Sequence, residues 1–357
     1  MDANRRQLLA TGLIALGILA VGAPRCDEPV LTRKEEHGRQ IYGQMCAVCH
    51  GEKGEGYKAD QAPALGHPGF LAAASDGFLR TAIADGRRNT TMSAWATPRG
   101  GPLPYAAIDD VIAYLRRWGR AAPARLDERP PRGDVARGAP IFARACAGCH
   151  GAHGTEGPNV HIGAPQLLAS ASNGLLRDAL RNGRAPTTMP SFGDGLGDAG
   201  IEDTLALLRS WQAGAAPLPN LPPVRPAPLP LGPVPLHPKG PEPLGFRTQP
   251  LTTSVDVVKA QLDRGARLGL LDARAPSDYT AEHIAGAVSV PFYDPTPYLD
   301  KLPRDAWLVC YCACPHAESG QLAQKLVSSG FTKVTVLDEG LGVWKNKKYG
   351  TQTGTQP

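Results

Sequence analysis

The amino-acid sequence predicts two small all-α domains followed by an α/β domain with a parallel sheet. Three observations predict this fold class. Motifs in the first third of the 357-residue chain recur in its second third. A proline-rich segment then follows, and beyond Leu251 strand and helix patterns alternate. We therefore expect a duplicated domain, rather than a solenoid, joined to a separate third domain.

The composition is that of folded domains. Hydrophobic residues make up 42% and charged residues 20% of the chain, which is usual for globular proteins. The net charge of +5 is mildly basic, and no dense Lys/Arg stripe is interleaved with aromatic residues, so nucleic acid is not an expected partner. The 35 prolines and 41 glycines indicate long connections and loop-rich domains.

Residues 1–29 are predicted to be a signal peptide or an N-terminal membrane anchor. Arg5 and Arg6 precede an uncharged, apolar run from Leu8 to Pro24, which is the order found in export signals. If it is not cleaved, this run has about enough residues to span a bilayer. Cys26 lies where a lipoprotein cysteine would, although the arginine before it departs from that pattern. We expect a periplasmic protein, or one on the outer face of the cytoplasmic membrane.

The repeat defines two all-α domains, at residues 30–122 and 133–214. Each copy starts with a helical pattern before a pair of cysteines and closes with an amphipathic helix that ends in tryptophan, Trp118 or Trp211. The recurring segments are residues 37–42 with 137–142, 71–80 with 168–177, and 85–92 with 182–189.

Each of these domains contains a C-x-x-C-H motif, the attachment signature of c-type haem. The motif residues are Cys46, Cys49 and His50 in the first copy and Cys146, Cys149 and His150 in the second. Two thiols three positions apart on a short helix can each add to one vinyl group of the porphyrin. The adjacent histidine then lies under the iron as its axial ligand. We therefore expect two covalently bound haem c groups.

The second axial ligand of each iron is expected to be a loop methionine. Of the four methionines, Met45 adjoins Cys46 on the proximal side and cannot reach the distal face. Met92 and Met189 lie at corresponding places on loops rich in Gly, Thr and Pro, and a thioether there raises the potential. Alternative distal candidates are His67, His153 and His161, none of which recurs between the copies. With both iron positions filled, electron transfer is the expected function.

The two domains resemble class I cytochrome c domains in the haem motif, the loop methionine and the closing helix. This resemblance covers a little under half of the chain. It implies that Tyr42 and Phe142 lie on the first helix of each domain and pack against the closing helix. It also implies that Pro63 and Pro165, each in an Ala-Pro-x-Leu segment, lie beside the haem and support the axial histidine. Redox protein partners follow from the same resemblance.

Residues 215–249 are predicted to be a proline-rich linker. Residues 217–243 contain 12 prolines, so this stretch lacks donors for helix or sheet. We expect extended polyproline II structure that acts as a semi-rigid spacer.

Residues 250–350 are predicted to form the α/β domain. Short apolar runs suitable for buried strands occur at residues 268–272, 307–311 and 334–337, and helical patterns occur at 254–264 and 318–329.

This third domain resembles the rhodanese family. The resemblance rests on Asp272 and Arg274, on Tyr279 and residues 283–291, and on Cys312 directly after the strand at 307–311. It implies that Cys312 attacks a sulfane-sulfur donor, carries a persulfide and passes the sulfur to a thiophilic acceptor. Asp272 and Arg274 would brace the active-site region. The loop leads into a helix N-terminus, whose amides favour a thiolate or persulfide.

The loop at residues 312–319 departs from the usual rhodanese pattern. It is one residue longer, it lacks the arginine often found there, and Glu318 adds negative charge, which disfavours thiosulfate as the donor. Cys312 and Cys314 are expected to form either a C-x-C disulfide or a redox pair, with Cys310 buried on its strand. His316 either holds the thiolate or caps the following helix.

The sequence thus predicts an exported dihaem c-type cytochrome that transfers electrons and is fused to a rhodanese-like domain. That domain would carry sulfane sulfur as a Cys312 persulfide and act on a small sulfur compound. The alternative is a pure electron carrier whose catalytically inert third domain serves docking or redox sensing.

Overall fold

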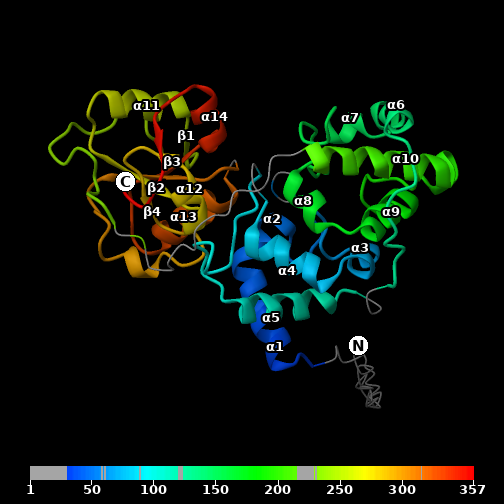
Figure 1. Ribbon diagram of the computed structural model, residues 1–357. Coiled ribbons are helices and arrows are strands. Elements are labelled where there is room, and N and C mark those ends of the chain that lie inside the picture. The colour runs from blue at the N-terminus through cyan, green and yellow to red at the C-terminus, as the bar shows by residue number, and fades with distance from the viewer. Residues whose placement is uncertain are drawn as a thin grey trace, which may run out of the picture.

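The computed structural model describes residues 30–214, apart from residues 58, 60, 61, 88, 89 and 120–123, together with residues 229 and 231–357, apart from residue 315. The predicted signal or anchor at residues 1–29 lies outside the described residues. Two helical domains and one α/β domain are visible in Figure 1, so the predicted fold class is confirmed. Among the described residues, no helix is both long enough and apolar enough to cross a membrane.

The first helical domain starts with α1 (Arg33–Ile41), which runs through a π-helical turn, η1 (Tyr42–Cys46), into α2 (Ala47–His50). Its other helices are α3 (Pro68–Ala73), α4 (Asp76–Asp85) and α5 (Tyr105–Arg116). A capping box between Thr32 and Glu35 fixes the start of α1. Helix α1 crosses α5 at Gly38, where an added Cβ would lie 1.9 Å from the carbonyl oxygen of Asp110. Only glycine allows this close approach.

The second helical domain repeats this arrangement. Its helices are α6 (Val135–Ala145), α7 (Ala147–His150), α8 (Pro165–Ser170), α9 (Asn173–Asn182) and α10 (Gly193–Gly214), the last kinked at Gly197. The predicted aromatic packing is confirmed in both copies. The ring of Tyr42 lies 5.0 Å from that of Trp118, and Phe142 lies 4.8 Å from Trp211.

The α/β domain contains a five-stranded parallel sheet in the order β1-β6-β5-β2-β4. Its strands are β1 (Thr252–Thr253), β2 (Leu268–Asp272), β4 (Val288–Ser289), β5 (Trp307–Tyr311) and β6 (Val334–Leu337); β3 (His283–Ile284) and β7 (Thr351–Gln352) form an antiparallel pair. The helices are α11 (Val255–Asp263), α12 (Pro276–Ala281), α13 (Ala317–Ser328) and α14 (Gly340–Asn346), with a 3-10 turn, η2 (Thr296–Tyr298). The central strands are buried on both faces, which explains their continuous apolar sequences.

The described part of the proline-rich segment packs on the α/β domain. The amide of Leu236 donates to the carbonyl oxygen of Leu268 at 2.9 Å, and that of Arg267 donates to Pro241 at 2.9 Å. The side chain of Leu236 joins the apolar core of the domain. Residues 231–249 therefore do not act as the extended spacer that the sequence suggested.

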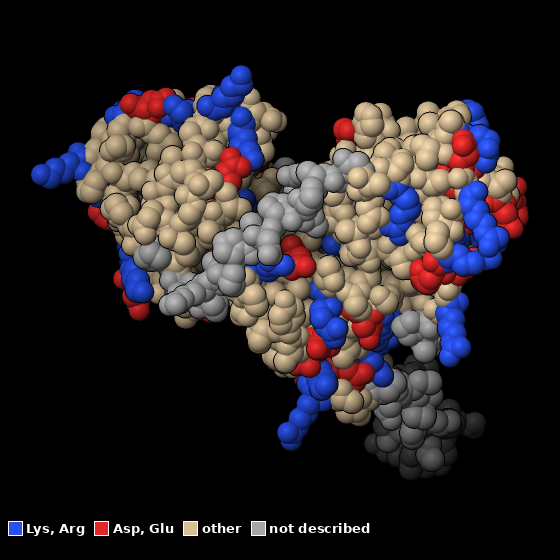
Figure 2. Space-filling model, viewed as in Figure 1, with Lys and Arg blue, Asp and Glu red and all other residues tan. Residues whose placement is uncertain are grey.

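The α/β domain lies directly against the first helical domain (Figure 1). One hydrophobic cluster contains buried residues of both domains. The Trp95 and Tyr293 rings lie 5.8 Å apart across this boundary, and Ser277 Oγ donates to the carbonyl oxygen of Ala94 at 2.9 Å. On the face in Figure 2, acidic and basic side chains are interspersed over the three domains.

Candidate haem sites and candidate sulfur site

The two haem-motif histidines are buried and held in the same way. His50 Nδ1 lies 2.9 Å from the carbonyl oxygen of Pro63, and His150 Nδ1 lies 2.8 Å from that of Val160. A carbonyl only accepts hydrogen bonds, so Nδ1 carries the proton and the lone pair of Nε2 remains for a metal. Burial lowers the pKa of both rings, which favours the neutral, metal-binding form.

The prediction that Pro165 supports His150 is wrong. Pro165 is the first residue of α8, and Val160 accepts the hydrogen bond from His150 instead. The histidine and its carbonyl partner are 13 positions apart in the first domain but 10 apart in the second. This difference in loop length shifts the register, so the two Ala-Pro-x-Leu segments do not correspond in space.

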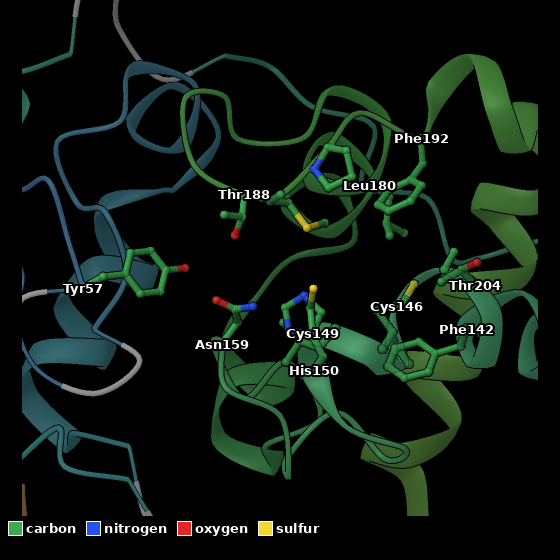
Figure 3. Close-up of a pocket in the computed structure, with 15 residues that line it drawn as sticks. Tyr57, Phe142, Cys146, Cys149, His150, Asn159, Leu180, Thr188, Phe192 and Thr204 are labelled. Carbon is green, nitrogen blue, oxygen red and sulfur yellow. The ribbon is translucent and has the colours of Figure 1, made fainter.

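In the second domain, the haem-motif helix and the methionine loop enclose one cavity. Cys146, Cys149, His150 and Met189 all line it, with Phe142 among the apolar residues around them. Figure 3 shows His150 and Cys149 pointing into this cavity from α7, with Thr188 across from them on the methionine loop.

The methionine loops have the same hydrogen bonds in both domains. The Arg184 amide donates to the Met189 carbonyl oxygen at 2.9 Å, and the Met189 amide donates to Thr187 Oγ1 at 3.3 Å. In the first domain, the matching distances are 2.8 Å from Arg87 to Met92 and 3.2 Å from Met92 to Thr90 Oγ1. The repeated Thr-Thr-Met sequence therefore produces one loop conformation twice.

A partly buried arginine of the methionine loop offers a further test of whether haem fits. Arg184 Nη2 is buried and has no hydrogen-bond partner among the described residues, although Nη1 lies 2.9 Å from Asp178. Burial lowers the pKa of Arg184, and Asp178 opposes that shift. An unpaired guanidinium N–H in a buried site suits an anion such as a haem propionate. Arg87 is its counterpart in the first domain, where burial lowers its pKa to about 10.

Sequence reasoning missed Tyr57 of the first domain, which lies at the cavity of the second. Figure 3 shows its ring pointing toward the cavity that Cys149 and Asn159 line. It lies between the repeated motifs, so no sequence signal marks it.

Two of the alternative distal histidines have other partners: His67 Nε2 contacts the Ala185 carbonyl oxygen of the second domain, and His153 lies 3.5 Å from Glu156.

In the α/β domain, Asp272 and Arg274 form a buried brace. Arg274 donates to the two carboxylate oxygens of Asp272, from Nε at 2.9 Å and from Nη2 at 2.6 Å. Tyr311 Oη donates to the same carboxylate at 2.8 Å, and Arg274 Nη2 also donates to the carbonyl oxygen of Glu282. The two residues therefore tie the end of β2 to the end of β5, which leads into Cys312.

Cys312 lies in a cradle of hydrogen-bond donors. Its Sγ is 3.2 Å from Ser319 Oγ and 3.4 Å from Cys314 Sγ, and as a thiol it can donate to the carbonyl oxygen of Cys314. Burial raises the pKa of Cys312, but hydrogen bonds from Cys314, from Ser319 and from the Glu318 amide outweigh burial and lower it to about 7. The hydrogen bonds from Ser319, Cys314 and the Glu318 amide therefore favour the thiolate form of Cys312.

The other loop residues differ from the expectations. Burial raises the pKa of Glu318 well above its ordinary value, so burial opposes the negative charge that the sequence suggested beside Cys312. His316 Nε2 lies 2.7 Å from Asp338, and its ring makes no cap hydrogen bond to α13. His316 thus neither holds the thiolate nor caps the helix through its side chain. Cys310 is fully buried, as predicted.

The sulfur site is buried, and the first helical domain packs next to it. Cys312 is 0% exposed and Cys314 is 2% exposed. Ser93, the residue after Met92, donates to the carboxylate of Asp278 at 2.5 Å. The burial of Cys312 and this contact across the domain boundary were not predictable from the motif.

A histidine with a free Nε2, two cysteines three positions apart at a short helix and a loop methionine define a c-type cytochrome domain. Comparison with known families agrees with this class. A family model described as cytochrome c oxidase, cbb3-type, subunit III, matches residues 33–115 and 133–208, and a rhodanese-like domain model matches residues 254–347. The chain therefore consists of tandem cytochrome c domains, which bind haem c covalently, followed by a rhodanese-like domain.

Individual relatives are more distant. The chain is 29% identical to the cbb3-type cytochrome c oxidase subunit CcoP of Azospirillum sp. over 57% of this chain and 70% of that protein. It is 28% identical to the cytochrome bc1 complex cytochrome c subunit of Corynebacterium diphtheriae, over 52% and 71% respectively. The solved rhodanese-like domain of an Anabaena sp. protein is 30% identical over 29% of this chain and 79% of that one, with a TM-score of 0.28.

Proposed function

We propose that the protein is a dihaem electron carrier, with one haem c in each cytochrome domain. His50 and Met92 would be the axial ligands in the first domain, and His150 and Met189 those in the second. The observation that supports this most directly is that His150, with its free Nε2, and Met189 line one cavity together with both motif cysteines. In the first domain, the hydrogen bonds of His50 and Met92 match those of His150 and Met189, so we propose the same kind of ligand pair there.

When bound, haem c supplies a one-electron couple between ferric and ferrous iron. The cysteines would fix the porphyrin as thioethers, and the carbonyl oxygens of Pro63 and Val160 orient the imidazoles. Met92 and Met189 would supply thioethers as the second ligands, which would favour the ferrous state and leave no iron position for a substrate. Arg184 Nη2 would donate to a propionate.

The two domains are in contact, which suits electron transfer between them. Tyr57 of the first domain lines the cavity of the second, and His67 contacts Ala185. The CcoP subunit and the cytochrome bc1 complex subunit that this chain resembles are parts of respiratory complexes. We therefore infer that the partners of this chain are also redox proteins. We place the protein outside the cytoplasm, either in the periplasm or on the outer face of the membrane, because residues 1–29 have the pattern of an export signal or anchor.

For the rhodanese-like domain, we infer that Cys312 carries sulfane sulfur. Its thiolate would attack the outer sulfur of a sulfane donor, form a Cys312 persulfide and expel the rest of the donor as an anion. The support is the cradle of Ser319 and backbone amides, which lowers the pKa of Cys312 to about 7.

A second candidate function is a pure electron carrier with an inert third domain. The observation that favours it is the complete burial of Cys312 in a region that the first cytochrome domain packs against. Sulfur transfer to cyanide separates the two candidates. If Cys312 carries sulfur, polysulfide-treated wild type should release thiocyanate and Cys312→Ser should not. Equal, background-level release from both proteins would support the inert domain.

A further inference from the structure

The sulfur site lies at the boundary with the first haem-attachment helix. Helix α13, which begins just after the Cys312 loop, packs on α2, which carries Cys49 and His50. Figure 1 shows α13 on the side of the α/β domain that faces α2.

Hydrogen bonds join the rhodanese-like domain to the two segments of the first cytochrome domain that would hold the haem, the haem-motif segment and the methionine loop. On the cysteine side, Gln44 Nε2 donates to the carbonyl oxygen of Tyr293 at 3.0 Å. On the methionine side, Ser93 donates to Asp278. Both segments that would hold the first haem are therefore attached to the rhodanese-like domain.

Cys312 and Cys314 are arranged as a nucleophile and a resolving thiol. Their sulfur atoms lie 3.4 Å apart, and both cysteines are free. A disulfide bond is about 2.05 Å long, so a small movement of the C-x-C loop would join them. The hydrogen bond to Cys312, together with burial, raises the pKa of Cys314, which keeps it a thiol while Cys312 ionises.

We propose that Cys312 and Cys314 form a dithiol–disulfide couple that delivers electrons to the haems through the first cytochrome domain. This inference rests on the proposed function, because ferric haem c is the oxidant. Oxidation breaks the two S–H bonds, forms one bond between the Sγ atoms, and releases two protons to solvent and two electrons. The electrons leave singly, one for each of two ferric haems. A thiol reductant, two RSH oxidised to RSSR, would restore the dithiol by exchange.

The direction of flow follows from the ligands. Methionine ligation raises the potential of haem iron, whereas protein dithiol couples have low potentials. Electrons therefore run from the cysteine pair to the haems. The position of the pair suits this role, since α13, which follows the cysteine loop, packs on α2, the helix that would hold the first haem.

A metal ion bound at Cys312 and Cys314 is the alternative to a disulfide between them. Ligand atoms of Cys312, Cys314 and Glu318 all lie within 4.8 Å of one another, so a thiophilic metal such as zinc is the competing ligand. Metal binding would require ionised thiols that cannot form a disulfide.

The test uses full-length, haem-loaded protein oxidised with ferricyanide under anaerobic conditions and then desalted. Tris(2-carboxyethyl)phosphine, a two-electron reductant of disulfides, is added, and ferrous haem is followed by absorbance. In parallel, free thiols are alkylated in denaturant and mapped by mass spectrometry before and after the phosphine. The variants are Cys312→Ser and Cys314→Ser, with Cys310→Ala as the matched control because Cys310 is buried on β5 outside the pair.

Before reduction, we expect wild type and Cys310→Ala to contain a Cys312–Cys314 disulfide. After reduction, their haems should be reduced at least about tenfold faster than those of either serine variant. Fully alkylated Cys312 and Cys314 in the ferric protein, stoichiometric zinc, or equal rates in all four proteins would overturn the proposal. The two proposals fail separately: absence of haem in the same samples counts against the dihaem carrier, and thiocyanate release by Cys314→Ser reports on sulfur transfer alone.

Discussion

Ser93 Oγ donates a 2.5 Å hydrogen bond to Asp278 Oδ2, which joins the residue after Met92 to helix α12 of the rhodanese-like domain. Asp278 is desolvated at this boundary, and burial raises its pKa, while Arg274 and Ser93 oppose the shift. The contact places the methionine loop of the first cytochrome domain and the sulfur site in one continuous structure.

The Ser93–Asp278 pair should contribute measurable coupling between the two domains. A double-mutant cycle with Ser93→Ala and Asp278→Asn is expected to give a coupling free energy of about 1 kcal/mol in chemical unfolding of the holoprotein. Ser170→Ala, whose hydroxyl bonds only to backbone within α8, is the matched control. Fully additive effects of Ser93→Ala and Asp278→Asn would show that the domains do not interact through this bond.

Replacing either loop methionine should change one haem and leave the other unaltered. In Met92→Ala, we expect the first haem to lose its sulfur-to-iron absorption band, to have a lower reduction potential and to bind carbon monoxide when ferrous. Met189→Ala should do the same for the second haem. Optical redox titration measures both effects, and an unchanged band and potential in either variant would refute the ligand assignment for that domain.

Arg184 should raise the reduction potential of the second haem. Loss of a buried cation favours ferric iron, so Arg184→Gln is expected to lower the reduction potential of that haem. Arg181→Gln is a suitable control, because Arg181 is half exposed and pairs with Asp198 at the surface. If the two variants shift the potential equally, Arg184 Nη2 does not face the haem.

Much of this architecture follows from local sequence. The C-x-x-C-H motifs, the Thr-Thr-Met loops and the buried strands depend on residues close together in the chain, so pattern and spacing identify them. The partner of His150 could not be assigned in this way, since it depends on a loop whose length differs between the copies. The same holds for Tyr57, which reaches the second haem cavity only because two domains pack together.

The chemistry of the Cys312 loop was also only partly predictable. The sequence placed a carboxyl at Glu318 and suggested added negative charge, but burial raises the pKa of that group and opposes the charge. His316 has a left-handed backbone, with φ of 68°, and its ring contacts Asp338. Burial and backbone conformation of this kind depend on the folded chain and have no signature in the motif.

The reactivity of Cys312 should have a distinctive pH dependence. Its pKa is lowered from 9.0 to about 7, so the thiolate fraction and the alkylation rate should rise with a midpoint near pH 7 and level off above it. In Cys314→Ala, one donor to the thiolate is lost, and the midpoint should move to higher pH. Mass-spectrometric rates of iodoacetamide labelling at Cys312 measure this; a midpoint near 9 in the wild type would rule out the activated thiolate.

The central claim, that each cytochrome domain carries its own covalent haem, is tested most directly by the intact mass of the purified protein under denaturing conditions. The wild type should contain two haem c groups. One should remain in the double variant Cys46→Ala/Cys49→Ala, and one in Cys146→Ala/Cys149→Ala. A wild-type mass with one haem or none, or a double variant that retains both, would contradict it.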